Sequence, residues 1–203
     1  MARVMLASSS PRRRLLLQEA GVPFDWADPG VDDGLLARGE VTPAQWVASL
    51  AFLKASAGIE RLPVGGPNAR WIVLGADTLV VKDGELIGQA RSADAARRTI
   101  ERLRNGSHEV LTGVALIDMH SGERRLFVDA ASVRVGELTD DQVAAYVATG
   151  GWRGKAGAYN LSERLADGWP IEYSGDPATI VGLPMRRLIP VLGGLGVEIG
   201  AAV

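Results

Sequence analysis

The sequence feature that most constrains the fold is the apolar run Trp71–Val81, which contains a single carboxylate. Such a run predicts a long buried strand, and Asp83-Gly84 directly after it predicts a hairpin turn. Asp77 interrupts the run, and a buried carboxylate costs free energy unless it is paired or bound to a cation. We therefore interpret Asp77 as a functional residue. The alternative is that the strand ends at Ala76 and that Asp77 lies in a surface turn.

Capping and turn residues divide the rest of the chain into helices and strands. Helix starts are indicated by serine or threonine at the N-cap, with proline next in two cases, at Ser10, Thr42, Ser92 and Thr139. The predicted helices cover residues 11–20, 43–58, 93–104, 140–149 and 184–195. The predicted strands cover 4–7, 24–27, 109–118 and 123–135, with 170–173 irregular or a strand. The buried face of the second helix should be Trp46, Val47, Leu50 and Leu53. This mixture indicates an α/β or α+β protein with a cleft between two lobes.

Composition excludes several classes of function. The 203 residues include no cysteine, which excludes disulfides, iron–sulfur clusters, cysteine zinc sites and cysteine nucleophiles. The two histidines, His108 and His120, are not spaced as a metal pair, and the net charge of -2 argues against a broad nucleic-acid surface. No run reaches the ~18 apolar residues of a membrane span, and Met1–Ala7 is too short for a signal peptide. We therefore expect a cytoplasmic protein with no nucleic-acid or membrane partner.

A basic helix start is the second unusual feature. Arg12, Arg13 and Arg14 follow a serine-rich turn, at the helix end where the macrodipole disfavours cations. A helix N-terminus with exposed N–H groups binds anions, and arginine suits phosphate because it donates two parallel hydrogen bonds. The pattern indicates a phosphate site. A solvated basic face on an ordinary helix explains it equally well.

The third unusual feature of the sequence is a glycine-rich segment, Gly151–Tyr159. Arg153 and Lys155 add positive charge to a backbone that glycines make adaptable, so the segment could fold over phosphates or form a flexible hairpin. Lys54, late in its helix, suits the dipole there and is neutral on its own. His108 is more readily explained by a structural hydrogen bond than by catalysis.

Taken together, basic groups at Arg12, Lys54 and Lys155 and acids at Asp33 and Asp77 fit phosphate-ester or anhydride chemistry. A divalent metal would bridge carboxylates and phosphates, and a carboxylate would activate water. The pattern does not select a nucleotide.

Six motifs, in order, resemble those of the Maf family of septum formation inhibitor proteins. They are Leu6–Arg13, Leu50-Ala51 with Lys54-Ala55, Leu74–Val80, Gly106–His108 with Thr112-Gly113, Lys155–Tyr159 and Val181–Pro184. The resemblance covers nearly the whole chain and implies one Maf-like domain over residues 1–203. It implies an α/β fold like that of inosine-triphosphate pyrophosphatases, with an elongated mixed β-sheet flanked by helices and two lobes with a central cleft. It also implies hydrolysis of nucleoside triphosphates to monophosphate and pyrophosphate with Mg²⁺ or Mn²⁺.

The resemblance also implies roles for single residues. Asp77 is the catalytic carboxylate, which accepts a proton from water. Asp33 stands where the family usually has glutamate, and it would bind the metal together with Asp77. Asp32 could share that task. Arg12 and Thr78 lie at positions of base choice and match the branch that acts on dTTP and UTP. The expected substrate and phosphate contacts are Ser8, Arg12, Arg13, Lys54, Thr78, Gln89, Lys155 and Ser162. A homodimer is compatible with the family, although the sequence indicates no interface.

The chain departs from the family pattern at several positions. Gln89 replaces a lysine, which should weaken phosphate binding, and Gly154 replaces an aspartate. Ser162 replaces the Gln of the dTTP/UTP branch or the Glu of the 7-methyl-GTP branch, with Glu163 next to it. Gly175–Pro177 is closer to the 7-methyl-GTP branch. The expected activity is therefore on dTTP, UTP or modified pyrimidine nucleotides. The alternatives are 7-methyl-GTP-type specificity and a nucleotide-binding regulator of septum formation with a weakened site.

Overall fold

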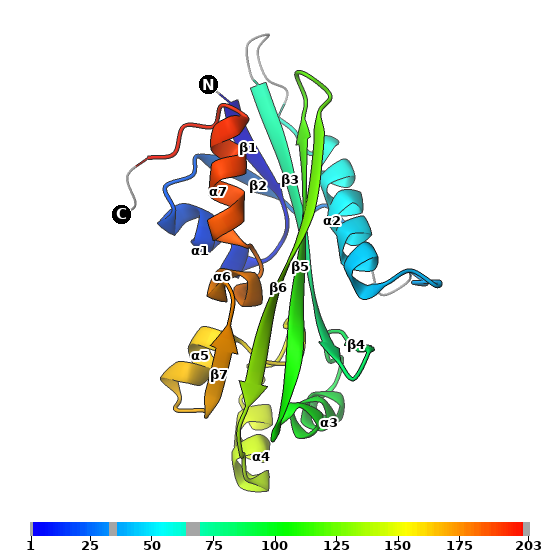
Figure 1. The fold of residues 1–203 in the computed structure, drawn as a ribbon, viewed down its shortest axis with the longest axis vertical. Helices are drawn as coiled ribbons and strands as arrows, with labels where there is room; N and C mark the ends of the chain where they lie inside the picture. Colours follow the sequence, from blue (N-terminus) through cyan, green and yellow to red (C-terminus); the bar gives the residue numbers. More distant parts are fainter. Residues whose placement is uncertain (1, 33–35, 64–69, 201–203) are drawn as a thin grey trace. The chain divides into compact units, whose positions relative to one another are not determined.

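The computed structural model describes residues 2–32, 36–63 and 70–200, and these form an α/β fold with a mixed seven-stranded sheet flanked by helices (Figure 1). The predicted fold class is confirmed. Strands follow each other in the sheet as β2-β1-β3-β5-β6-β7, with β4 paired to β3. Their bounds are β1 Ala2–Ala7, β2 Phe24–Ala27, β3 Arg70–Lys82, β4 Glu85–Ile87, β5 Gly106–Asp118, β6 Arg124–Val135 and β7 Ile171–Ser174.

The helices begin where capping residues predict. Thr42 and Thr139 both form complete capping boxes, and Ser92 accepts from the backbone of Ala95, whereas the Ser10 side chain makes no capping bond. The helices are α1 Pro11–Glu19, α2 Pro43–Ile59, α3 Ala93–Leu103, α4 Asp140–Ala148, α5 Leu161–Ala166, α6 Pro177–Val181 and α7 Met185–Gly194. Helices α5 and α6 were not expected from the sequence. Among the described helices, none combines the length and the apolar character that a membrane span requires.

The chain divides into two compact units. The first runs to Asp77 and adds Thr112–Asp129 and the segment from Gly182 onward, and the second comprises Thr78–Leu111 and Ala130–Val181. Each unit has apolar clusters of its own. The expected cleft between two lobes stays a prediction.

Strand β3 runs through Asp77 without interruption, so the alternative that it ends at Ala76 is wrong. After β3, Asp83 and Gly84 both have positive φ (53° and 76°), as a type I′ hairpin requires, and β4 returns antiparallel.

In the first unit, the two-residue period of the strands separates two apolar clusters. Val4, Leu6, Ile72, Leu74 and Ala76 pack with α1 and α7. The alternate residues Met5, Ala7, Trp71 and Val73 pack with α2 (Figure 1). Since successive side chains point to opposite faces, continuing this alternation puts Asp77 on the face that α2 covers.

Helix α2 buries small residues against this face. Ala51, Ala55 and Gly58 are buried, along with Val47 and Leu50. Leu53 is 42% exposed, so its predicted place on the buried face is wrong. Alanine and glycine take up much of the buried face because their small side chains let the helix backbone come close to the strands.

Candidate functional site

In the first unit, the carboxylate of Asp77 is paired with the ammonium of Lys54. The distance from Nζ to Oδ1 is 2.6 Å, and the side chains are only 14% (Lys54) and 8% (Asp77) exposed. A pair so shielded from water carries a desolvation cost that a surface ion pair, worth about 0–1 kcal/mol, does not carry. The carboxylate that interrupted the apolar run is therefore compensated by a cation, as its burial requires.

The close approach of α2 to β3 depends on Gly75. A Cβ at this position would lie 2.2 Å from the carbonyl oxygen of Ala51 and 2.4 Å from the backbone nitrogen of Ala55. Only glycine fits between the strand and the helix backbone. Because Lys54 precedes Ala55 and Asp77 follows Gly75 on the same face, this contact brings the ammonium and the carboxylate together.

Ser8 and Arg13 form a second buried group in the first unit. Arg13 donates from Nε to the carbonyl oxygen of Gly182 (2.9 Å) and from Nη1 to Oγ of Ser8 (3.2 Å), and the backbone N–H of Ser10 donates to the same hydroxyl (3.2 Å). Ser8 is 4% and Arg13 is 9% exposed. Arg13 thus joins the first predicted motif to the last, and it is not part of a solvated face.

The other two arginines of the basic run have different surroundings. The Arg14 guanidinium lies over the Trp26 ring, 3.9 Å from its centroid, where a cation is attracted to the π system. Arg12 is half-buried. The three arginines therefore do not act as one basic patch.

In the second unit, the segments that carry Gln89 and Lys155 are adjacent. Gln89 and Ala156 form an antiparallel bridge, and the N–H of Gly157 donates to the carbonyl oxygen of Gly88 (3.2 Å). Gln89 is exposed, whereas Lys155 is 7% exposed. Two residues predicted to bind phosphate, 66 positions apart in the sequence, thus lie in neighbouring backbone segments.

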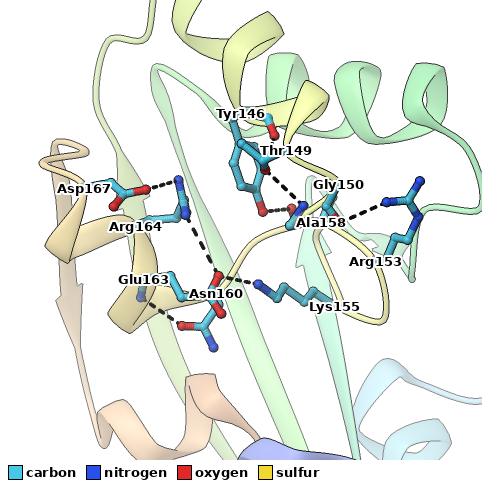
Figure 2. Close-up of polar contacts among 11 residues, drawn as sticks. Tyr146, Thr149, Gly150, Arg153, Lys155, Ala158, Asn160, Glu163, Arg164 and Asp167 are labelled. Atoms are coloured by element: carbon cyan, nitrogen blue, oxygen red, sulfur yellow. Dashed lines mark hydrogen bonds and ion pairs between the residues drawn. The ribbon is translucent and has the colours of Figure 1, made fainter.

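Figure 2 shows that the Lys155 ammonium pairs with the carboxylate of Glu163. Glu163 lies in the first turn of α5, where its backbone N–H donates to the Asn160 side chain (3.0 Å). Its carboxylate is also 3.9 Å from a guanidinium nitrogen of Arg164, which pairs with Asp167 at 2.8 Å. The two buried cations and two exposed carboxylates therefore form one charged group.

The glycine-rich loop before α5 is packed into the second unit. The Tyr146 hydroxyl donates to the carbonyl oxygen of Ala158 (2.8 Å), and Ala158 itself has a φ of 60° (Figure 2). Tyr159 hydrogen-bonds to Nε2 of His108 at 2.8 Å. These contacts hold the backbone that carries Lys155.

His108 has the structural role that the sequence favoured. Burial, with a smaller contribution from the charge of Lys82, lowers the pKa of His108 to about 4. Burial also raises the pKa of Tyr159 above its ordinary value. Both groups are therefore neutral at pH 7, and their hydrogen bond connects β5 to the loop.

The remaining predicted residues have simpler placements. Thr78 is half-buried in β3 directly after Asp77, and Ser162 is exposed in the first turn of α5. Asp33 lies outside the described residues, and Asp32 is exposed. In the described ranges no three metal-ligating side chains of His, Asp or Glu come together.

Sequence reasoning missed two features of this region. Asn160 and Glu163 have the spacing of an N-cap and a third helical residue, a signal that could have predicted α5. A second buried carboxylate, Asp118, is 1% exposed; its hydrogen bond from Arg70 at 2.5 Å is the main cause that lowers its pKa. Asp118 also accepts from the backbone of His120 at the turn after β5, so its role is structural.

Comparisons with known proteins agree with the motifs. A sequence profile of the family described as Maf, Maf-like protein, matches residues 3–195. A protein of Symbiobacterium thermophilum named dTTP/UTP pyrophosphatase is 40% identical over 199 residues, 98% of this chain and 97% of the relative. Relatives with the same name are 38% identical in Salinibacter ruber (189 residues, 93% of this chain and 89% of the relative) and in Moorella thermoacetica (202 residues, 98% of each). The matched region contains every candidate site residue described above.

Proposed function

Because this chain belongs to the Maf family, we propose that it is a nucleoside triphosphate pyrophosphatase that converts dTTP and UTP to the monophosphate and pyrophosphate. Relatives that match nearly the whole chain carry the name dTTP/UTP pyrophosphatase, which supports this choice of substrate. The observation that carries the proposal is the buried pair of Lys54 and Asp77. It provides a carboxylate base and a cation side by side, on a rigid strand and helix.

The reaction adds one water molecule across the anhydride bond between the α and β phosphates. The carboxylate of Asp77 accepts a proton from that water while the water oxygen attacks the phosphorus atom. Pyrophosphate then leaves and keeps the bridging oxygen. The Lys54 ammonium balances the carboxylate before the reaction and donates to phosphate oxygens during it. Ser8 and Arg13, with the serine-rich turn at the start of α1, bind the phosphates and are fixed by their bonds to each other and to Gly182.

Mg²⁺ or Mn²⁺ is the proposed cofactor. Mg²⁺ is typically held by one or two carboxylates together with substrate phosphates, rather than by a complete protein cage. The hard oxygens of Asp77 and the predicted second carboxylate, Asp33, fit this donor set. When bound, the cation would neutralise charge on the phosphates.

The second unit contributes the other proposed contacts. Lys155 and Gln89 bind phosphate, and Thr78 and Ser162 contact the nucleotide, with Arg12 of the first unit contributing to the choice of base. Residues 1–203 are proposed to act as one Maf-like domain, because the family profile matches residues 3–195 and so includes both units. Nucleotide substrates are cytoplasmic metabolites, so the cytoplasm is the proposed location. A homodimer is the proposed oligomeric state, and light scattering would test it.

The deciding experiment measures pyrophosphate release from dTTP, UTP, 5-methyl-UTP, pseudo-UTP, CTP, GTP and 7-methyl-GTP, with Mg²⁺, Mn²⁺ or EDTA. We expect metal-dependent release from dTTP and UTP, and Asp77→Asn should reduce this release by a factor of at least about 100. Release confined to 7-methyl-GTP would assign the other branch. If the folded protein bound dTTP in calorimetry but hydrolysed none of these nucleotides, the result would contradict the proposed pyrophosphatase activity. It would support the alternative of a nucleotide-binding regulator.

A further inference from the structure

Strand β4, the segment that follows it and helix α3 of the second unit line an open groove of about 490 Å³. This volume lies within the ~300–1,000 Å³ of typical small-molecule pockets. Its polar lining residues are Gln89, whose side chain is exposed, Arg91, Arg98, Thr99 and Arg102. All of the lining belongs to the second unit.

The charge of the groove has one sign. Arg91, Arg98 and Arg102 line it, and none of its described lining residues is acidic. Positive groups gathered around a hollow focus their field there and attract anions. Arg91 and Arg98 are exposed and have no ion pair within the described part of the chain, so their guanidinium groups are available to a ligand.

The acidic residues nearby are engaged elsewhere. Glu101 pairs with Arg97, one turn along α3, at 2.9 Å, and Glu85 pairs with Arg102 at 2.8 Å. Arg102 is therefore partly neutralised and holds β4 to α3. Asp94 stands one turn before Arg98 but does not line the groove. The net charge facing the groove thus comes from Arg91 and Arg98.

The groove also adjoins the loop that carries Lys155. Gln89 lines the groove and forms the backbone bridge to Ala156, the residue after Lys155. Lys155 itself does not line the groove. The guanidinium groups and the side-chain amide of the groove are donors suited to phosphate oxygens, and arginine suits them best because it donates in pairs.

We propose that the groove between β4 and α3 is a binding site for the polyphosphate group of a nucleotide or for free pyrophosphate, with Arg91 and Arg98 as its ligands. This inference rests on the proposed function and extends it. It assigns phosphate binding to Arg98 of α3 and to Arg91 just before that helix, and neither residue belongs to a motif of the family. Arg91 and Arg98 supply positive charge beside the uncharged amide of Gln89.

Inorganic pyrophosphate is the probe, titrated into the full-length Asp77→Asn protein and followed by NMR and calorimetry. We expect shifts at the backbone amides of Gly88–Ala90 and at Nε of Arg98. Arg98→Gln should weaken this groove binding about tenfold, and Arg91→Gln with Arg98→Gln should weaken it further. Raising the salt concentration should weaken it as well, because the groove is open to solvent.

Arg97→Gln is the matched control, because Arg97 is on the same helix but pairs with Glu101 and does not line the groove. It should leave pyrophosphate binding unchanged. Shifts confined to residues outside the groove, or equal weakening by Arg97→Gln and Arg98→Gln, would overturn the proposal. If pyrophosphate bound in the groove but the wild-type protein hydrolysed no nucleoside triphosphate, the proposed function would be overturned and the groove would still be a pyrophosphate site.

Discussion

The ammonium of Lys54 lies 2.6 Å from Oδ1 of Asp77, although the two residues are 23 positions apart. Helix α2 supplies one and strand β3 the other. The pair explains how a carboxylate persists in the middle of a buried strand, and it places a cation and a base on one face of the sheet.

Asp77→Asn should reduce pyrophosphate release by a factor of about 100 to 10,000, the usual contribution of a general base. The variant should also be less stable, by up to about 3 kcal/mol, because the Lys54 ammonium loses its ion pair with the Asp77 carboxylate. Turnover is measured with dTTP, and stability by urea unfolding.

The double variant Asp77→Asn with Lys54→Met tests the stability part of this prediction alone, because Lys54 is itself a proposed phosphate contact. With both charges removed, we expect the free energy of unfolding to recover relative to Asp77→Asn, while turnover stays at least as low as in Asp77→Asn. A double variant no more stable than Asp77→Asn would contradict the ion-pair argument.

Gly75→Ala should destabilise the first unit by about 3 kcal/mol or more, because the added methyl would meet the backbone of α2 at Ala51 and Ala55. Any folded fraction should also lose turnover, since moving α2 moves Lys54. Gly193→Ala in α7 is the matched control: its Cβ would meet nothing within 4 Å. That change should be neutral or stabilise by up to about 1 kcal/mol. Equal melting temperatures for the two variants would contradict the packing argument.

Glu163→Gln should lower KM for the triphosphate several-fold with little change in kcat. The carboxylate of Glu163 pairs with the Lys155 ammonium and so competes with phosphate for it. Asp167→Asn is the control, because Asp167 pairs with Arg164 in the same charged group without contacting Lys155. A higher KM in Glu163→Gln would show that Glu163 orients Lys155 instead of competing for it.

Stability should fall on acidification through the titration of His108. Its pKa is lowered to about 4 in the folded protein from 6.5, so the unfolded chain binds a proton in this window that the folded chain does not. Stability therefore rises with pH between about 4 and 6.5, by about 3 kcal/mol in total. His108→Gln should flatten the pH dependence of urea unfolding over that range. An unchanged slope would mean that another group titrates there.

Local signals in the sequence were sufficient for most of the secondary structure. Thr42 and Thr139 form the capping boxes that their spacing predicts, and Asp83-Gly84 makes the hairpin. Such motifs satisfy backbone hydrogen bonds within a few residues, so no distant partner decides them. The short helices α5 and α6 show too little periodicity to be predicted from their apolar pattern, and the cap spacing of Asn160 and Glu163 is a local signal for α5.

The sequence by itself determined that Asp77 needs a partner, because a carboxylate in an apolar strand is costly when it is alone. The tertiary structure alone decided the partner. Lys54 reaches Asp77 because Gly75 lets α2 pack closely on β3. Arg13 likewise reaches Gly182 across 169 positions. Contacts between residues so far apart depend on how helices and strands pack, which local patterns do not encode.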